Sequence, residues 1–256
     1  MNGLVKRQLQ LPGVTLCAAA SVNVAATARA LAACMDQVEF GRCILFTDAD
    51  AAPLRPGIEI IAIGHLASAS AYSRFVLANI VDHIETSHCL IAQWDGHVLS
   101  AERWCDSFLE YDYVGASWPQ FDDGFEVGNG GFSLRSRRLM ALCRNADFLA
   151  GHPEDVAICR TNRAWLERHG MRFAPVSVAD RFSCERAGDP CASFGFHGGF
   201  NIPRALGTDA FWGVYRELDE YSSLRPDFAD LARRLLRGRN PVRRMARLVT
   251  DRLLRW

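Results

Sequence analysis

The chain has 256 residues, which is enough for one α/β domain with a substantial buried core. Hydrophobic residues make up 49% of it and charged residues 23%, so its composition excludes an intrinsically disordered chain. The formal net charge is zero, but residues 225–256 hold ten arginines against three aspartates. The remaining chain is therefore acidic overall, and a basic tail on an acidic body predicts a separate role for the tail.

The nine cysteines include no Cys-x-x-Cys pair, and several of them lie within apolar runs. This pattern is typical of reduced core thiols in a cytosolic protein, rather than of a disulfide framework or a zinc site. No apolar run approaches the roughly 20 residues that span a bilayer. Residues 31–34 (LAAC) resemble a lipoprotein cleavage site, but the polar residues before them disfavour a signal peptide. We therefore expect a cytoplasmic protein.

Short apolar strands alternate with amphipathic helices in the first part of the chain. We predict strands at residues 14–20, 43–46, 58–63 and 89–92, and helices at residues 23–36 and 70–84, the first capped by Asn23. This alternation predicts a mainly parallel sheet covered by helices on both faces. Ligands of such sheets bind beyond the carboxyl ends of the strands, which draws attention to residues 93–96 (QWDG).

The second half is less regular. We predict a helix at residues 101–111, a loop rich in Gly, Trp, Pro and Asp at 115–131, and a strand at 132–135. Ser136 is expected to cap the helix that follows, and Pro153 to occupy the first turn of a helix that runs to about residue 169. Residues 172–175 and 192–196 are short extended candidates, and residues 241–256 form a tail helix.

Seven segments carry a resemblance to known proteins. They are LFTD (45–48), YSRF (72–75), LIAQWDG (90–96), YVGASWP (113–119), GNGGFSLRSR (128–137), HPEDVAIC (152–159) and FGFHG (194–198). In this order they resemble an uncharacterised family of bacterial domains related to GT-A-fold glycosyltransferases, over about residues 14–203. The resemblance implies a single GT-A-like domain at residues 1–224, with a Rossmann-like, mainly parallel sheet and an irregular acceptor-side half. Residues 225–256 would follow it as a basic amphipathic tail.

The resemblance also implies a divalent metal ion, Mn²⁺ or Mg²⁺, at Asp95. GT-A enzymes typically place an Asp-x-Asp motif after the fourth strand, where the metal neutralises the departing diphosphate. Here Gln93 holds the first position, so only the last carboxylate is present, and a turn aspartate before glycine is the alternative. In related families a late histidine completes the metal shell, and His197 matches that position. An exposed loop histidine is the alternative there.

A second acidic string, Asp48-Ala49-Asp50, follows the second predicted strand. It matches the Asp-x-Asp motif, but it comes too early in the order of strands to hold the metal. Asp48 is therefore a candidate contact for the nucleoside of the donor. A polar turn at the end of a strand is the alternative, and the simpler one.

Glu154 and Asp155 follow Pro153, where acidic residues in a first helical turn favourably meet the helix dipole. The functional interpretation makes Asp155 the catalytic base and Glu154 its support, because inverting enzymes with a Glu-Asp-Val string use the aspartate in this way. Such a base accepts the proton of the acceptor hydroxyl as that oxygen attacks the anomeric carbon. The transition state would have oxocarbenium character.

The remaining candidates are contacts to the donor. The run of residues 128–131 lacks the setting of a dinucleotide site, and by resemblance its Asn129, Gly130 and Gly131 cradle the donor sugar. Trp94 is a candidate for stacking on a sugar or base, although packing in the core is the usual role of such a ring. Tyr72 and Arg74 are candidate nucleotide contacts, with a core tyrosine and a solvated arginine as the alternatives.

The tail repeats apolar residues at helical spacing, with arginines on the other faces. This is the pattern of a helix that lies on an anionic membrane surface, and docking on a partner or on the chain's own core is the alternative. We expect a peripheral position on the inner face of the cytoplasmic membrane. The apolar positions are Val242, Met245, Val249, Leu253 and Trp256.

Together these features predict an inverting glycosyltransferase of cell-surface polysaccharide synthesis. Its donor is a nucleotide sugar, with a UDP-sugar favoured, and its acceptor is a glycan or a lipid-linked sugar. An inactive GT-A-like module that binds carbohydrate or protein is the alternative, supported by the incomplete Asp-x-Asp motif. A metal-dependent hydrolase that uses Asp95, Asp155 and His197 is a third hypothesis. No nucleic-acid partner is expected, because the body is acidic and carries no recognition motif.

Overall fold

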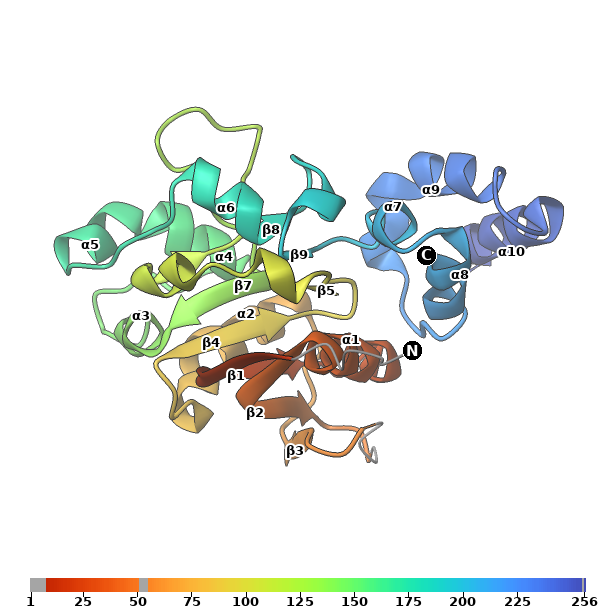
Figure 1. Ribbon diagram of the computed structural model, residues 1–256. Helices are drawn as coiled ribbons and strands as arrows, with labels where there is room; N and C mark the ends of the chain where they lie inside the picture. Colours follow the sequence, from red (N-terminus) through yellow and green to blue (C-terminus); the bar gives the residue numbers. More distant parts are fainter. Residues whose placement is uncertain (1–7, 51–54, 255) are drawn as a thin grey trace, which may run out of the picture.

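A six-stranded sheet forms the centre of the molecule, and the computed structural model describes residues 8–50, 55–254 and 256. The strands lie in the order β3-β2-β1-β4-β7-β6 (Figure 1). Strands β1 to β4 run parallel, β7 is antiparallel to β4, and β6 is antiparallel to β7, which confirms the predicted mainly parallel sheet. The strands are β1 (Leu9–Ala19), β2 (Val38–Thr47), β3 (Glu59–Ala62), β4 (His88–Ala92), β6 (Tyr113–Val114) and β7 (Phe132–Ser136).

The side chains of β1 alternate between two apolar layers, as expected of a strand that is covered on both faces. Leu16 and Ala18 pack in one core with α1 (Val24–Gln37) and α6 (Val176–Phe182). Cys17 and Ala19 belong to the opposite core, with α2 (Ala69–Ala78) and the 3-10 turn η1 (Ile80–His83). The sheet is therefore the middle layer between two layers of helices.

The element order predicted for the first part of the chain is confirmed, with one correction at Asn23. This residue precedes α1, but its φ of 53° is left-handed and its side chain caps no helical N–H group. Its Oδ1 instead accepts the backbone N–H groups of Asp219 and Glu220 at 2.9 and 3.0 Å. The residue ties the start of α1 to a segment almost 200 positions later in the chain, a contact that local propensity does not reveal.

The helix predicted at residues 101–111 is wrong. That segment forms two 3-10 turns, η2 (Ala101–Arg103) and η3 (Asp106–Glu110). The break between them lets the rings of Trp104 and Phe108 pack together, with 5.3 Å between their centroids, and Trp104 also meets Phe194 at 5.1 Å. Packing of these rings against the core overrides the helical pattern.

Two further predictions of the second half have different outcomes. Ser136 caps α3 (Arg137–Leu142) as predicted, because its Oγ accepts the N–H group of Leu139 at 3.1 Å. The helix expected from Pro153 to residue 169 is instead divided into α4 (Glu154–Val156), the π turn η4 (Ala157–Thr161) and α5 (Arg163–Arg168). Asn162 stabilises the division by donating its side-chain amide to the carbonyl of Ala157 at 2.8 Å.

A small second sheet packs beside the first, with strands β5 (His97–Val98), β9 (Gly195–Phe196) and β8 (Ser183–Cys184) in that order. Its strand β5 follows closely after β4, and β9 pairs with β5 by the register His97↔Phe196. This pairing brings the segment after β9 to the carboxyl end of β4. The 3-10 turn η5 (Pro190–Ala192) precedes β9, so only the end of the extended piece predicted at residues 192–196 is a strand.

The last helices gather beyond the sheet, in blue in Figure 1, and we call residues 202–254 the C-terminal lobe. Phe211, Leu231 and Leu248 share its core, so helices on both sides of residue 225 pack together. The predicted tail helix forms as α10, which packs against the other helices of the lobe. The helices are α7 (Ile202–Ala205), α8 (Thr208–Tyr215), η6 (Ser222–Asp227), α9 (Phe228–Leu235) and α10 (Pro241–Leu254).

All nine cysteines are free thiols, and seven of them are buried, in agreement with their predicted place in the core. Burial raises the pKa of the Cys34 thiol to about 12, so this thiol stays protonated at neutral pH. Within the described ranges, none of the helices combines the length and the hydropathy that crossing a bilayer requires.

Candidate functional site

A cleft of about 420 Å³ lies at the carboxyl ends of β1 and β4. The chain leaves β1 in one direction along the sheet, towards β2 and β3, and returns to β4 on its other side. Open sheets of this kind bind ligands in the crevice at such a reversal. The volume also lies within the range of small-molecule sites. The residues of β1 and β4 and of the segments that follow them line the cleft, among them Ala19, Ser21, Asn23, Gln93 and Trp94.

Two helix N-termini border this cleft. Asn23 and Thr27 line it at the start of α1, and Ser68 and Ala69 line it at the start of α2. The N-terminus of a helix carries partial positive charge and presents backbone N–H groups, so it favours anions. The cleft lining contains no lysine or arginine within the described part of the chain. A phosphate-bearing ligand would therefore depend on these helix ends or on a bound cation.

Tyr72, Gln93 and Trp94, three of the predicted donor contacts, line the same cleft. Gln93 donates its side-chain amide to the hydroxyl oxygen of Tyr72 at 3.0 Å, which joins α2 to the segment after β4. Burial raises the pKa of the Tyr72 hydroxyl, so it stays protonated and can donate a hydrogen bond.

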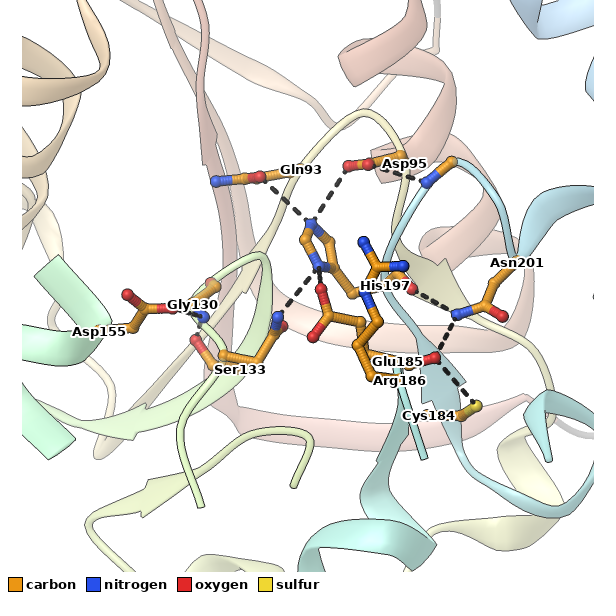
Figure 2. Close-up of polar contacts among 12 residues, drawn as sticks. Gln93, Asp95, Gly130, Ser133, Asp155, Cys184, Glu185, Arg186, His197 and Asn201 are labelled. Atoms are coloured by element: carbon orange, nitrogen blue, oxygen red, sulfur yellow. Dashed lines mark hydrogen bonds and ion pairs between the residues drawn. The ribbon is translucent and has the colours of Figure 1, made fainter. Parts of the chain in front are cut away.

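His197 is the centre of a cluster of polar side chains that includes Gln93, Asp95 and Glu185, as Figure 2 shows. Its Nε2 lies 3.3 Å from Oδ1 of Asp95 and 3.3 Å from Oε1 of Gln93. Its Nδ1 lies 3.2 Å from Oε1 of Glu185 and 3.2 Å from the side-chain amide of Asn129. Asp95 and His197 are thus in contact although 102 positions separate them in the chain.

The imidazole of His197 offsets part of the negative charge of Asp95 and Glu185. Burial opposes the charged form of His197, but the carboxylates of Asp95 and Glu185 outweigh it and raise its pKa to about 10. The ring is therefore an imidazolium at neutral pH in this arrangement. The other carboxylate oxygen of Asp95, Oδ2, accepts the backbone N–H group of Gly199 at 3.0 Å, whereas the buried Oδ1 contacts Nε2 of His197.

Two glycines of the loop before β7 leave room for these side chains. A Cβ atom on Gly131 would lie 2.0 Å from Nε2 of His197, and one on Gly130 would lie 2.3 Å from Oε1 of Glu154. Only glycine fits at either position. The space beside the glycines is thus occupied by His197 and Glu154.

Asp155 lies beside the same glycine loop. Its Oδ2 accepts a hydrogen bond from the N–H group of Gly130 at 2.9 Å (Figure 2). Burial, followed by the charge of Glu154, raises the pKa of Asp155. Glu154 is fully buried and pairs with the equally buried Arg135, with 3.0 Å between Oε1 and Nη2. Its carboxylate is therefore held in an ion pair, whereas Asp155 keeps a half-buried carboxyl group.

Asp48 and Arg74 lie outside the cleft lining. Asp48 contacts Nδ1 of His65 at 2.7 Å, and hydrogen bonds from Ser21 and His65 lower its pKa. Because Ser21 itself lines the cleft, Asp48 stands at its rim. Arg74 donates to the hydroxyl oxygen of Ser70 at 3.1 Å on the exposed side of α2.

Sequence reasoning missed Glu185 and Arg135. Glu185 follows directly on β8 in a segment without periodic pattern, and no local signal identifies it as the partner of His197. Arg135 did have a signal, because a charged residue within a buried apolar strand usually has a buried partner. Among the residues described, no three His, Cys, Asp or Glu side chains form a metal-binding group. The amide oxygen of Gln93 lies beside Nε2 of His197, the nitrogen that also faces Asp95.

A family model described as "Protein of unknown function (DUF5672)" matches residues 57–197, more than half of the chain. The chain belongs to this family. The matched segment contains β4, the glycine loop, Asp155 and His197, so the cluster around His197 lies within it. No curated protein gives a significant match.

Several solved structures resemble the chain at low identity. A glycosyltransferase involved in the glycosylation of the major capsid of PBCV-1 is 11% identical, with a TM-score of 0.44 over 79% of this chain and 98% of that one. The mannosyltransferase PcManGT from Pyrobaculum calidifontis, solved in complex with GDP-Man and Mn²⁺, is 14% identical, with a TM-score of 0.44 over 96% and 82%. A mycobacterial protein is 8% identical, with a TM-score of 0.36 over 49% and 53%. Likenesses at this level do not assign an activity to this member of the DUF5672 family.

Proposed function

We propose that this chain is a glycosyltransferase that moves a sugar from a nucleotide diphosphate to a glycan or lipid-linked acceptor. The observation that carries the proposal is the position of the cleft. It lies where the strand order reverses, between two helix N-termini and directly in front of the cluster of Gln93, Asp95 and His197. A diphosphate suits the helix ends, and the aromatic ring of Trp94 suits a base or sugar.

A divalent metal fits the residues beside the cleft. Oδ1 of Asp95 is buried and contacts Nε2 of His197, and Oε1 of Gln93 lies 3.3 Å from the same nitrogen. An oxygen-rich set with one imidazole suits Mn²⁺ or Mg²⁺. These three side chains would hold the ion, with the imidazole in its neutral form, and Glu185 would orient the ring through Nδ1. Such an ion neutralises charge on a departing diphosphate when it is bound.

Asp155 is the proposed base. Burial raises its pKa towards the range in which a carboxylate accepts a proton effectively, and its hydrogen bond from Gly130 fixes its orientation. It would accept the proton of the acceptor hydroxyl as that oxygen attacks the anomeric carbon and the nucleotide diphosphate departs, which inverts the configuration. The ion pair of Glu154 with Arg135 makes Glu154 a positioning residue in this scheme.

Calorimetry with UDP and GDP, each with and without Mn²⁺, tests the proposal directly. We expect one of the two nucleotides to bind, with UDP favoured, and Asp95→Asn to weaken the effect of the metal. Failure of both nucleotides to bind at any metal concentration would contradict the proposal. Binding without hydrolysis or transfer of any nucleotide sugar would instead identify an inactive carbohydrate-binding module.

A further inference from the structure

A basic pocket of about 540 Å³ lies in the C-terminal lobe, between α8 and α10. It shares no lining residue with the cleft. Five arginines and one aspartate line it, together with Trp212, Gly213 and Asn240, so the lining carries a large positive excess. The charged residues are Asp209, Arg216, Arg239, Arg243, Arg244 and Arg247.

Two of these arginines are already paired, and their contacts hold the pocket together. Arg244 is buried and donates to Oδ1 of Asp209 at 2.5 Å, which joins α10 to α8. Arg247 donates to Oδ2 of Asp251 at 2.6 Å, and the same carboxylate accepts the hydroxyl of Tyr215 at 3.0 Å. The walls of the pocket are therefore built by contacts within the lobe.

The other three arginines are exposed. Arg216, Arg239 and Arg243 form no ion pair or side-chain hydrogen bond within residues 8–50, 55–254 and 256. A guanidinium group presents several N–H donors in a planar fork that fits phosphate oxygens. Three free guanidinium groups around one hollow therefore form a site for a phosphate-bearing anion.

The side of α10 that lies opposite its buried residues is apolar. Its buried residues are Arg244, Leu248 and Asp251, so the opposite side of the helix points away from the lobe. At 3.6 residues per turn, that opposite side contains four residues in line, which we call the outward stripe. The outward stripe consists of Val242, Ala246, Val249 and Leu253, and the exposed fractions of Val242, Val249 and Leu253 are 80%, 40% and 77%.

This arrangement divides the predicted apolar tail positions between two surfaces. Met245 and Trp256 pack against the core of the lobe, whereas Val242, Val249 and Leu253 face outward. Arginines flank the outward stripe. A helix with an exposed apolar stripe between cationic flanks is typical of membrane interfaces.

We propose that the C-terminal lobe binds the surface of an anionic phospholipid bilayer. The outward stripe enters the interfacial region, and Arg216, Arg239 and Arg243 hold lipid phosphates at the basic pocket. The exposed stripe favours a lipid over a soluble phosphate, because a soluble phosphate would engage the pocket and leave the stripe in water. Membrane binding of this kind does not depend on sugar transfer by the cleft.

Cosedimentation of the full chain with vesicles tests this proposal, with phosphatidylcholine vesicles compared with mixed phosphatidylcholine–phosphatidylglycerol vesicles. Each arginine near an anionic surface contributes about fivefold to affinity, so replacing all three free arginines by glutamine should lower it about a hundredfold. A matched triple variant, R103Q/R168Q/R181Q, removes the same charge from exposed positions on the other half of the molecule. It should retain nearly all of the binding.

Two further variants separate the parts of the proposal. V242S/L253S removes apolar surface from the outward stripe, leaves the pocket intact, and should weaken binding by about tenfold or more. Gly213→Glu places a carboxylate at the pocket, and a Cβ atom there meets nothing within 4 Å, so the lobe accommodates it. It should bind vesicles more weakly than Gly213→Gln, which has the same shape without the charge.

Three outcomes would overturn the proposal. The first is equal binding to neutral and anionic vesicles, and the second is unchanged binding by the triple arginine variant. The third is calorimetric binding of inorganic phosphate or pyrophosphate by a chain that does not sediment with anionic vesicles, which would identify a soluble anion as the ligand.

Discussion

The cleft and the basic pocket differ in the burial and pairing of the charged side chains near them. Beside the cleft, two groups of charged side chains are buried and paired: Arg135 and Glu154 are 1% and 6% exposed, and His197 lies between two carboxylates. In the basic pocket, three arginines are exposed and lack a partner among the described residues. Buried charges have lost their hydration and need compensating partners, whereas exposed ones keep it and are available to a ligand.

This difference sets the size of the effects that substitutions should have. A change at a buried charge leaves its partner uncompensated, so a single substitution should have a large effect that salt hardly alters. A change at an exposed arginine removes one of several weak attractions, so each effect should be small, roughly additive and sensitive to salt. The predictions below test this contrast.

The largest effect is expected for Asp155→Asn. Removing a general base should lower kcat by about 10²–10⁴-fold. The amide oxygen still accepts the hydrogen bond from Gly130, so affinity for the nucleotide should stay unchanged in calorimetry. Transfer at the normal rate by this variant would show that another group is the base.

The same aspartate should set the pH dependence of transfer. The proposed base must be ionised to accept a proton, and burial raises the pKa of Asp155. Activity should therefore fall as the pH decreases through a value above the ordinary aspartate pKa of about 3.9. The profile of kcat/KM against pH measures this limb, and a limb at or below the ordinary value would contradict the assignment.

Glu154→Gln should reduce stability more than any surface change. It leaves the guanidinium of Arg135 buried without its counter-charge, which costs about 3–5 kcal/mol in the free energy of unfolding. Asp82→Asn breaks the exposed pair with Arg144 and should cost less than about 1 kcal/mol. Urea denaturation of both variants measures the difference, and equal costs would remove the contrast between buried and exposed pairs.

Gly131→Ala should disturb the cluster around His197. The added Cβ atom would lie 2.0 Å from Nε2, so the ring must leave its position between Asp95 and Glu185. Misorientation of a ligand of this kind typically costs about 10–100-fold in metal affinity. Titration with Mn²⁺ measures this loss, and Gly213→Ala, where the new atom meets nothing, is the matched control.

The smallest effect is expected for single arginines of the basic pocket. Arg239→Gln should weaken binding to anionic vesicles about fivefold, and raising the salt concentration should reduce both the binding and this difference. Cosedimentation at two salt concentrations measures it. A loss as large as that of the triple variant would indicate one dominant contact instead of additive attraction.

Much of the sheet was predictable from the sequence because its elements follow local periodicity. The apolar runs of β1 to β4 appear where predicted, and the position of Gln93, Trp94 and Asp95 at a carboxyl end follows from that order. Ser136 as a helix cap is equally local. The failure at residues 101–111 has a tertiary cause, because Trp104 and Phe108 pack into the core.

The sequence by itself therefore determined the alternating strands and helices, the polar residues after β4 and the amphipathic character of α10. Only the tertiary structure decided which residues from distant segments contact these elements. The pairing of β5 with β9 brings His197 to Asp95, and the pairing of β9 with β8 brings Glu185 to His197. The docking of α10 through Leu248 turns Val242 and Leu253 to solvent. The periodicity of apolar residues indicates which residues of an element are buried. Contacts between distant segments depend instead on how the two sheets and the lobe pack together.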